Sequence, residues 1–198
     1  MTKKQKMILW IGVGIAGFLL LVILIGGILI PTVLKSYFKL EHRDWIEQYS
    51  NAYEVDPYLV SAVIFCESKY RPDAISRAGA RGLMQIMPTT GAEIAEALGE
   101  AYDPDQLFDP ETSIRYGTYY LRMQLDRFDN NPAVVLAAYN AGPHRAEQWV
   151  ADYGLDSRGH ICYIPFQETD HYVDKVLGAQ KVYEMLYRNA FSAGAEEE

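Results

Sequence analysis

The sequence has few cysteines and few basic residues for its length, and both shortages limit the classes of protein it can be. Two cysteines, Cys66 and Cys162, allow at most one disulfide bond, and nothing in their spacing brings the sulfur atoms together, so we favour free thiols. Residues 31–198 hold 18 − 3 = 15 basic residues against 26 acidic ones, a formal charge of −11. Nucleic-acid binding needs clustered lysine and arginine, so we predict no nucleic-acid partner.

Motifs for metal, nucleotide and serine-nucleophile chemistry are also missing. The four histidines have no metal-ligand spacing such as His-Glu-x-x-His, so we predict no metal and no cofactor. The glycine-rich stretch from Ala78 to Gly82 lacks the Gly-Lys-Ser/Thr of a phosphate loop, and is better explained as a turn that allows close backbone approach. No serine lies at a strand-to-helix elbow, which argues against Ser-His-Asp catalysis.

No sustained strand alternation occurs, and the apolar residues instead recur at helical spacing. Asp56-Pro57, Asp109-Pro110 and Asn131-Pro132 each place a capping residue before a proline, which is typical of the first position of a helix. We predict helices from these three starts, one beginning near Trp45, and a long last helix from about Glu168 to Tyr187. The predicted fold class is therefore mainly α.

A membrane-spanning segment is predicted at the N-terminus. Residues 7–30 form a run of 24 residues without a charge, which as a helix would measure about 36 Å and cross a bilayer core. A cleaved signal peptide would have a shorter apolar region and a small-residue cleavage site, whereas Pro31-Thr32-Val33 follows here, so we favour an uncleaved anchor. Three lysines before the span place the N-terminus in the cytoplasm, although three basic residues after it weaken this bias.

We divide the chain into four parts. Residues 1–30 are the cytoplasmic N-terminus and transmembrane anchor, 31–44 a stalk, 45–190 the main domain, and 191–198 a solvated acidic tail. The part beyond the span is long enough for one domain with a single core. It is predicted to be extracytoplasmic, in a single-pass protein of the cell membrane that contacts the lipid bilayer through residues 7–30.

One glutamate occupies a position that the helical pattern assigns to a hydrophobic residue. In a helix from Pro57 to Tyr70, Val60, Val63, Ile64 and Glu67 fall at i, i+3, i+4 and i+7, so Glu67 is predicted to face the core. The carboxyl could instead be exposed, if the predicted helix is misplaced, or paired with an arginine. If it is buried, desolvation raises its pKa and leaves a protonated acid near neutral pH, as glycosidic cleavage requires.

A second carboxylate, which glycoside hydrolysis normally uses, is hard to identify. Asp73 follows in a loop, and Asp103, Asp105 and Asp109 have the spacing of turn or capping residues. A reaction in which one carboxyl group carries out both proton transfers fits this sequence better.

Four blocks resemble, in order, the signature of the soluble-lytic-transglycosylase type of catalytic domain. They are Cys66-Glu67-Ser68, Gly82-Leu83-Met84-Gln85-Ile86-Met87-Pro88, Ala137-Ala138-Tyr139-Asn140-Ala141-Gly142, and Ile164-Pro165-Phe166-Gln167-Glu168-Thr169 followed by Tyr172-Val173. The resemblance covers roughly Trp45 to Arg188. It implies a lysozyme-like helical fold that cleaves the β-1,4 bond between N-acetylmuramic acid (MurNAc) and N-acetylglucosamine (GlcNAc) in peptidoglycan. In such enzymes one glutamate protonates the leaving oxygen and then acts as base while the muramoyl C6 hydroxyl attacks C1, which leaves a 1,6-anhydro end.

The same resemblance implies the residues of the site. Glu67 is the catalytic residue, and Tyr172 is the tyrosine that hydrogen-bonds its carboxyl group. The substrate-binding residues are Ser68, Ser76, Gln85, Met87, Tyr139, Asn140, Glu168 and Tyr172. Each of these has a simpler explanation in core packing, capping or turn formation. The chain departs from the family at Asp170 and His171, where many members have a basic residue, so the expected contact with a stem-peptide carboxylate is in doubt.

Three functions are compatible with these observations. The first is a membrane-anchored peptidoglycan lytic transglycosylase whose partners are glycan strands. The second is a muramidase of related fold that uses water, and the third is a non-catalytic wall-binding scaffold of an envelope-spanning machine. The joint presence of Glu67, Gln85 and Tyr172 favours an enzyme over the scaffold.

Overall fold

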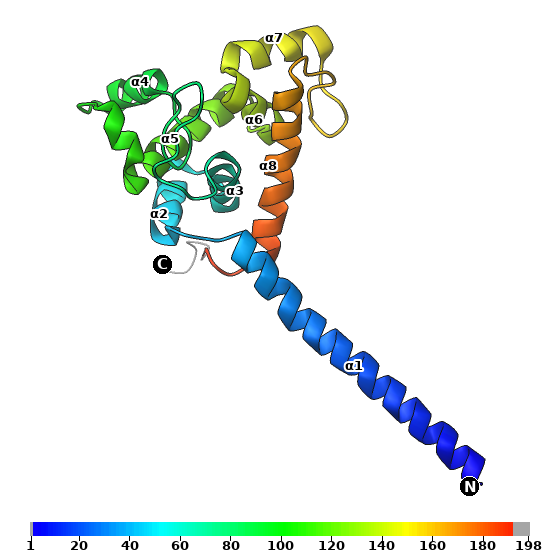
Figure 1. Cartoon of the computed structure of the whole chain (residues 1–198). Coiled ribbons are helices and arrows are strands. Elements are labelled where there is room, and N and C mark those ends of the chain that lie inside the picture. Colours follow the sequence, from blue (N-terminus) through cyan, green and yellow to red (C-terminus); the bar gives the residue numbers. More distant parts are fainter. Residues whose placement is uncertain (1, 192–198) are drawn as a thin grey trace, which may run out of the picture. The chain divides into compact units, whose positions relative to one another are not determined.

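The computed structural model describes residues 2–191, which form helices joined by loops (Figure 1). Within that range, β-structure is limited to isolated bridges that pair Ile75 with Arg81, Arg81 with Ile86, and Leu155 with Ile161. The chain divides after Lys39 into two compact units, the first containing helix α1 and the second containing all the other helices. The predicted mainly α fold is confirmed. Most of the predicted acidic tail, residues 192–198, lies outside the described residues.

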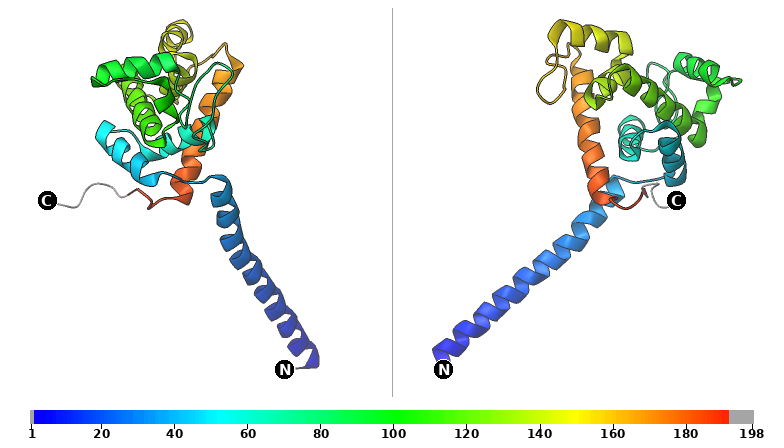
Figure 2. Two further views of the ribbon diagram at one scale, coloured as in Figure 1. Left: turned by 60° about the vertical axis from the view of Figure 1, so that its left-hand side comes forward. Right: turned by 180° about the vertical axis from the view of Figure 1, so that it is seen from behind.

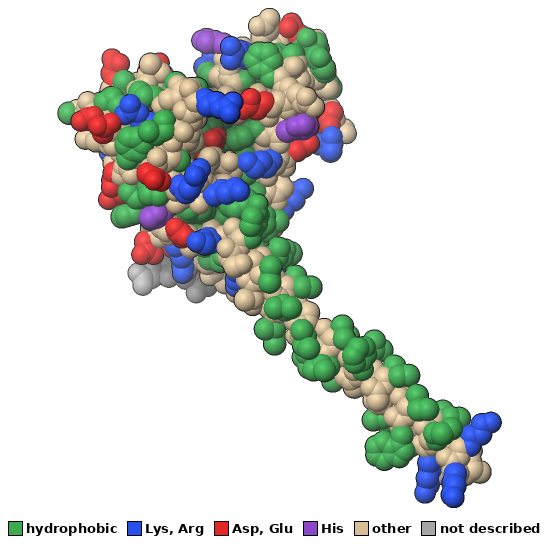
Figure 3. Space-filling view, in the orientation of Figure 1, with side chains coloured by type: hydrophobic (Ala, Val, Ile, Leu, Met, Phe, Trp, Pro, Cys, Tyr) green, Lys and Arg blue, Asp and Glu red, His purple; other side chains and the backbone are tan. Residues whose placement is uncertain are grey.

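Helix α1 (Lys3–Tyr37) is 35 residues long and measures about 52 Å. By length and composition it could cross a membrane, and none of its side chains is buried within the structure. Figure 3 shows hydrophobic side chains along most of its length and basic ones at its N-terminal end. The helix continues through Pro31, so the first part of the predicted stalk is helical. Pro31 has no N–H for the carbonyl of Gly27, a loss that transmembrane helices tolerate.

The domain is built around α3 (Pro57–Glu67), which packs against α2 (Arg43–Tyr53) and α8 (Gln167–Leu186). Asp56 accepts a hydrogen bond from the backbone N–H of Tyr58, and Pro57 occupies the first turn, as predicted. Every residue from Leu59 to Phe65 is buried. The predicted burial of Val60, Val63 and Ile64 is confirmed, and it extends to the residues between them because α3 is the central helix of the domain.

The second half of the domain adds two further helices before α8. The capped start at Asn131-Pro132 is confirmed in α6 (Pro132–Ala141), and the long last helix predicted from about Glu168 is confirmed in α8. Helix α7 (Pro143–Tyr153) lies between them in the chain. Helix α6 is buried from Ala133 to Ala138 and packs on α7 and α8. Helix α8 packs beside α3, which is seen nearly end-on in Figure 1 and in the right-hand view of Figure 2. The last turn of α3 thus lies among elements that are far apart in the sequence.

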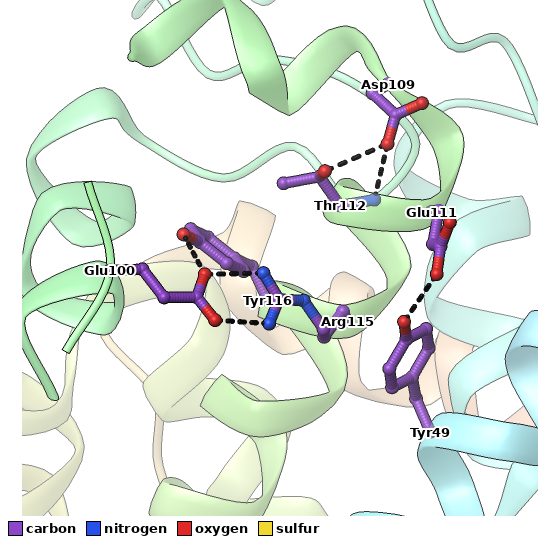
Figure 4. Close-up of polar contacts among 7 residues, drawn as sticks. All are labelled: Tyr49, Glu100, Asp109, Glu111, Thr112, Arg115 and Tyr116. Atoms are coloured by element: carbon purple, nitrogen blue, oxygen red, sulfur yellow. Dashed lines mark hydrogen bonds and ion pairs between the residues drawn. The ribbon is translucent and has the colours of Figure 1, made fainter. Parts of the chain in front are cut away.

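A network of polar contacts holds α5 (Pro110–Arg127) against its neighbours (Figure 4). Arg115 forms a two-bond ion pair with Glu100, which follows α4 (Pro88–Leu98), and Tyr49 of α2 donates to Glu111 at 2.6 Å. Asp109 caps α5 by accepting from the backbone N–H of Thr112 at 2.8 Å, and it also ends the short 3-10 helix η1 (Pro104–Phe108). These contacts hold α5, α4 and η1 together next to the loop from Arg71 to Met87.

That loop approaches η1 closely at Gly82, as predicted for the glycine-rich turn. Gly82 has a φ of +76°, and a Cβ atom there would lie 1.8 Å from the carbonyl oxygen of Leu107. Its N–H donates to the carbonyl of Ala74 at 3.0 Å, which closes the loop on itself. Only glycine fits both the backbone conformation and this contact.

Candidate active site

The catalytic candidate, Glu67, is the last residue of α3. The helix was predicted to run to Tyr70, but it ends three residues earlier because Lys69 and Tyr70 adopt left-handed φ values of 52° and 62°. Glu67 therefore lies at the edge of the core, partly buried, where its carboxyl group can reach a pocket. The alternative of a fully exposed carboxylate is wrong, and no ion pair to an arginine is found for Glu67 within the described residues.

A pocket of about 330 Å³ opens over Glu67 between α3, α6 and α8. Its lining contains four of the residues predicted from the sequence, which are Glu67, Asn140, Glu168 and Tyr172. They come from three helices and are up to 105 positions apart in the chain. The fold therefore brings together residues that lie in separate motifs of the sequence. Cys66, His171 and Lys175 complete the lining.

Tyr172 donates its hydroxyl hydrogen to Oε1 of Glu67 at 2.6 Å. Burial raises the pKa of Glu67 from 4.5 to about 7, and this effect exceeds the lowering that the Tyr172 hydrogen bond and the Lys175 charge produce. The nearby charge of Glu168 raises the pKa further. A carboxyl group with a pKa near 7 can both give and take a proton at neutral pH.

Two side chains of α6 lie close to this carboxyl group. Burial raises the pKa of Tyr139 well above its usual value, with a second contribution from the charge of Glu67. The Tyr139 hydroxyl donates to the carbonyl of Met84 at 2.8 Å and thereby ties α6 to the loop that precedes α4. Asn140 accepts a hydrogen bond from the hydroxyl of Thr169 at 2.7 Å, which links α6 to the first turn of α8.

The other predicted site residues lie outside the lining of this pocket. The Gln85 amide donates to the carbonyls of Ala74 and Gly82 at 3.0 and 2.9 Å, and the Ser76 hydroxyl accepts from the N–H of Ala80 at 3.0 Å. Ser68 is buried and bonds back to the carbonyl of Ile64 at 3.2 Å. Met87 immediately precedes α4 and is 37% exposed. The first three therefore have structural hydrogen bonds, whereas Met87 is accessible to a ligand.

Sequence reasoning missed Lys175, and it did not assign Cys66 or His171 to the site. A signal was available, because Glu168, His171, Tyr172 and Lys175 have the i, i+3, i+4, i+7 spacing of one helical face. Both cysteines are free, as favoured above, and burial raises the pKa of the Cys66 thiol to about 11. Among the residues that the structure describes, no group of three or more His, Cys, Asp or Glu side chains is placed to hold a metal ion.

A family model, the transglycosylase SLT domain, matches residues 44–159. The soluble lytic murein transglycosylase of Escherichia coli K12 is 36% identical over 159 residues, which cover 78% of this chain and 24% of that protein. The membrane-bound lytic murein transglycosylase C of Shigella sonnei is 38% identical over 107 residues, which cover 49% of this chain and 30% of that one. This chain thus spans about a quarter of the length of the first of these relatives.

Solved structures match the fold over most of the chain. An inactive glutamate-to-glutamine mutant of the lytic transglycosylase Slt from Pseudomonas aeruginosa superimposes with a TM-score of 0.73 at 33% identity, covering 80% of this chain and 26% of that one. A complex of the 70-kDa soluble lytic transglycosylase with bulgecin A gives a TM-score of 0.74 at 33% identity, with 82% and 27% coverage. The domain has the lysozyme-like helical fold of these structures.

Proposed function

Because this chain belongs to the transglycosylase SLT domain family, we propose that it is a membrane-anchored peptidoglycan lytic transglycosylase. It cleaves the β-1,4 bond between MurNAc and GlcNAc and leaves a 1,6-anhydro-MurNAc end. The observation that carries this proposal is the Glu67 carboxyl group, half-buried at the end of α3, held by Tyr172 at 2.6 Å and raised in pKa to about 7. The similarity to an inactive glutamate-to-glutamine mutant of another lytic transglycosylase agrees with a mechanism that depends on one glutamate.

Glu67 takes part in both halves of the reaction. In the first half, the protonated carboxyl group gives its proton to the glycosidic oxygen, the bond from C1 to that oxygen breaks, and the GlcNAc end leaves with a hydroxyl group. In the second half, the resulting carboxylate accepts the proton of the muramoyl C6 hydroxyl while O6 forms a bond to C1. Glu67 is then protonated again, and no water is consumed.

The other residues of the pocket orient this carboxyl group and the sugar. Tyr172 fixes the carboxyl oxygen that it bonds, so the opposite oxygen is the one available to the substrate. Asn140 and Glu168 line the same pocket and offer polar groups to sugar hydroxyl or N-acetyl groups. Met87 is accessible enough to contact the apolar face of a sugar ring. Gln85 and Ser76 support the backbone of the loop between α3 and α4, and Ser68 supports the end of α3.

The test is digestion of purified peptidoglycan by the full-length protein in detergent, beside a Glu67→Gln variant, with the products analysed by mass spectrometry. Fragments one water lighter than hydrolysis products, with a 1,6-anhydro end and absent from the variant, are expected. Reducing ends would make the protein a muramidase. Binding of glycan without any product would make it a wall-binding scaffold.

The N-terminal helix supports a membrane location for this activity. Helix α1 is long and apolar enough to cross a bilayer, and two relatives are named membrane-bound lytic murein transglycosylases. We place the N-terminus in the cytoplasm and the domain outside, because Lys3, Lys4 and Lys6 precede the apolar run. Resistance of the domain to protease added to the outside of spheroplasts would contradict this orientation.

A further inference from the structure

Lys175 lies on α8 one turn after Tyr172 and lines the same pocket as Glu67. Its Nζ atom donates a hydrogen bond to the backbone carbonyl of Cys66 at 3.0 Å. Cys66 directly precedes Glu67 in the last turn of α3, where helical carbonyl groups have no partner within the helix. Two side chains of α8 therefore hold one turn of α3, with Tyr172 bonded to the carboxyl group and Lys175 to the backbone.

The positive charge of Lys175 is also favourable at the C-terminal end of α3. The carbonyl groups at the C-terminus of a helix carry partial negative charge, which a cation stabilises. The groups that face Glu67 are Glu168, His171, Tyr172 and Lys175 from α8, Tyr139 from α6, and Cys66 from α3 itself. Among the interactions that act on the ionisation of Glu67, Lys175 favours the ionised form, whereas Glu168 and burial oppose it.

We propose that Lys175 is a positioning residue for Glu67, which holds the last turn of α3 in place and keeps a positive charge in the pocket of the carboxyl group. This role rests on the proposed transglycosylase activity. Glu67 has to carry a negative charge between the first and the second proton transfer, and a partly buried site disfavours that charge. The ammonium group limits this penalty, so the same carboxyl group can release its proton and later accept another.

Lys175→Met removes both the charge and the hydrogen bond. Because Glu67 must be protonated to act as the acid, the alkaline limb of the kcat/KM profile marks its ionisation. Without the positive charge the ionised form is less stable, so this limb moves to higher pH, by about half a unit to one unit after allowance for the exposure of Lys175. The value of kcat falls more than KM changes, because the charged state arises during turnover rather than on binding.

Two variants separate this role from simple support of the fold. Lys175→Arg keeps the charge and an N–H donor, and is expected to return the limb to its wild-type position. Lys181→Met removes one positive charge from the same helix, in a different pocket, and serves as the matched control with an unchanged limb. All variants are assayed as the full chain in detergent, with solubilised glycan strands as the probe and anhydro-muropeptides as the product, from about pH 5 to about pH 9.

An equal loss of rate at every pH in Lys175→Met, without recovery in Lys175→Arg, would reduce Lys175 to a structural contact and overturn the proposal. Unchanged kinetics would overturn it as well. If the wild-type protein forms no anhydro product, it is the proposed function that fails, and the ionisation of Glu67 is then followed through the free energy of unfolding against pH. In Lys175→Met, the fall in the free energy of unfolding that accompanies ionisation of Glu67 is expected at a higher pH than in the wild-type protein. A fall at the same pH would contradict the proposal.

Discussion

At the scale of single residues, the most informative group is the Glu67 carboxyl group, whose burial lowers the stability of the domain when the group is ionised. Glu67 has a pKa of about 7 in the folded domain, above the ordinary value of 4.5. The folded state therefore binds the Glu67 proton more tightly than the unfolded state does. Stability contributed by this group is fully present below about pH 4.5 and is lost as the pH rises through 7.

We expect Glu67→Gln to stabilise the domain increasingly as the pH rises. A difference of 2.5 pKa units corresponds to about 3 kcal/mol of unfolding free energy at pH values above 7, and to little below pH 4.5. Urea unfolding at an acidic and at an alkaline pH measures the change, and Glu96→Gln on the exposed side of α4 is the control. A stabilisation that is equal at both pH values would show that the pKa of Glu67 is not raised.

Tyr172 offers a second test at the same scale. Its hydrogen bond lowers the pKa of Glu67, so Tyr172→Phe should move the alkaline limb of activity to higher pH. The loss of orientation should also reduce kcat by about tenfold or more, because the carboxyl group is then free to rotate. Tyr120→Phe, at another tyrosine of the domain, is the control. Wild-type turnover in Tyr172→Phe would contradict a role for this bond.

At the scale of helices and loops, the starts of helices could be predicted and one important end could not. Asp56-Pro57, Asp109-Pro110 and Asn131-Pro132 begin helices because a cap and a proline act locally, within one turn. The end of α3 at Glu67 depends on left-handed residues at Lys69 and Tyr70, types that rarely adopt this conformation. The packing of α8 on α3, which brings Lys175 to the site, likewise depends on tertiary structure.

The loop between α3 and α4 supplies the next prediction. Gly82→Ala should lower the free energy of unfolding by about 3 kcal/mol or more, because the new Cβ atom would overlap the carbonyl oxygen of Leu107. Gly79→Ala, at a φ of +91° but with no atom within 4 Å, is the matched control and should cost about 1 kcal/mol. Equal losses in the two variants would mean that backbone conformation alone, and not the close approach to η1, requires glycine at position 82.

At the scale of the whole molecule, the two units differ in where their apolar side chains lie. Helix α1 exposes its apolar side chains throughout, whereas the second unit encloses a core of its own. The chain beyond residue 30 has a formal charge of −11, from 15 basic and 26 acidic residues, so anionic lipid does not attract it electrostatically. We therefore expect α1 to provide the membrane attachment.

A variant in which a cleavable secretion signal replaces residues 1–30 separates the two units. Because the domain has its own core, this variant should fold and digest solubilised glycan strands at the wild-type rate. It should leave the membrane fraction, since removal of some 24 apolar residues from a bilayer takes away far more hydrophobic free energy than surface contacts can replace. Carbonate extraction followed by an activity assay of both fractions measures this. If the variant stays with the membrane after extraction, the domain itself binds there, and the proposed role of α1 as the membrane anchor fails.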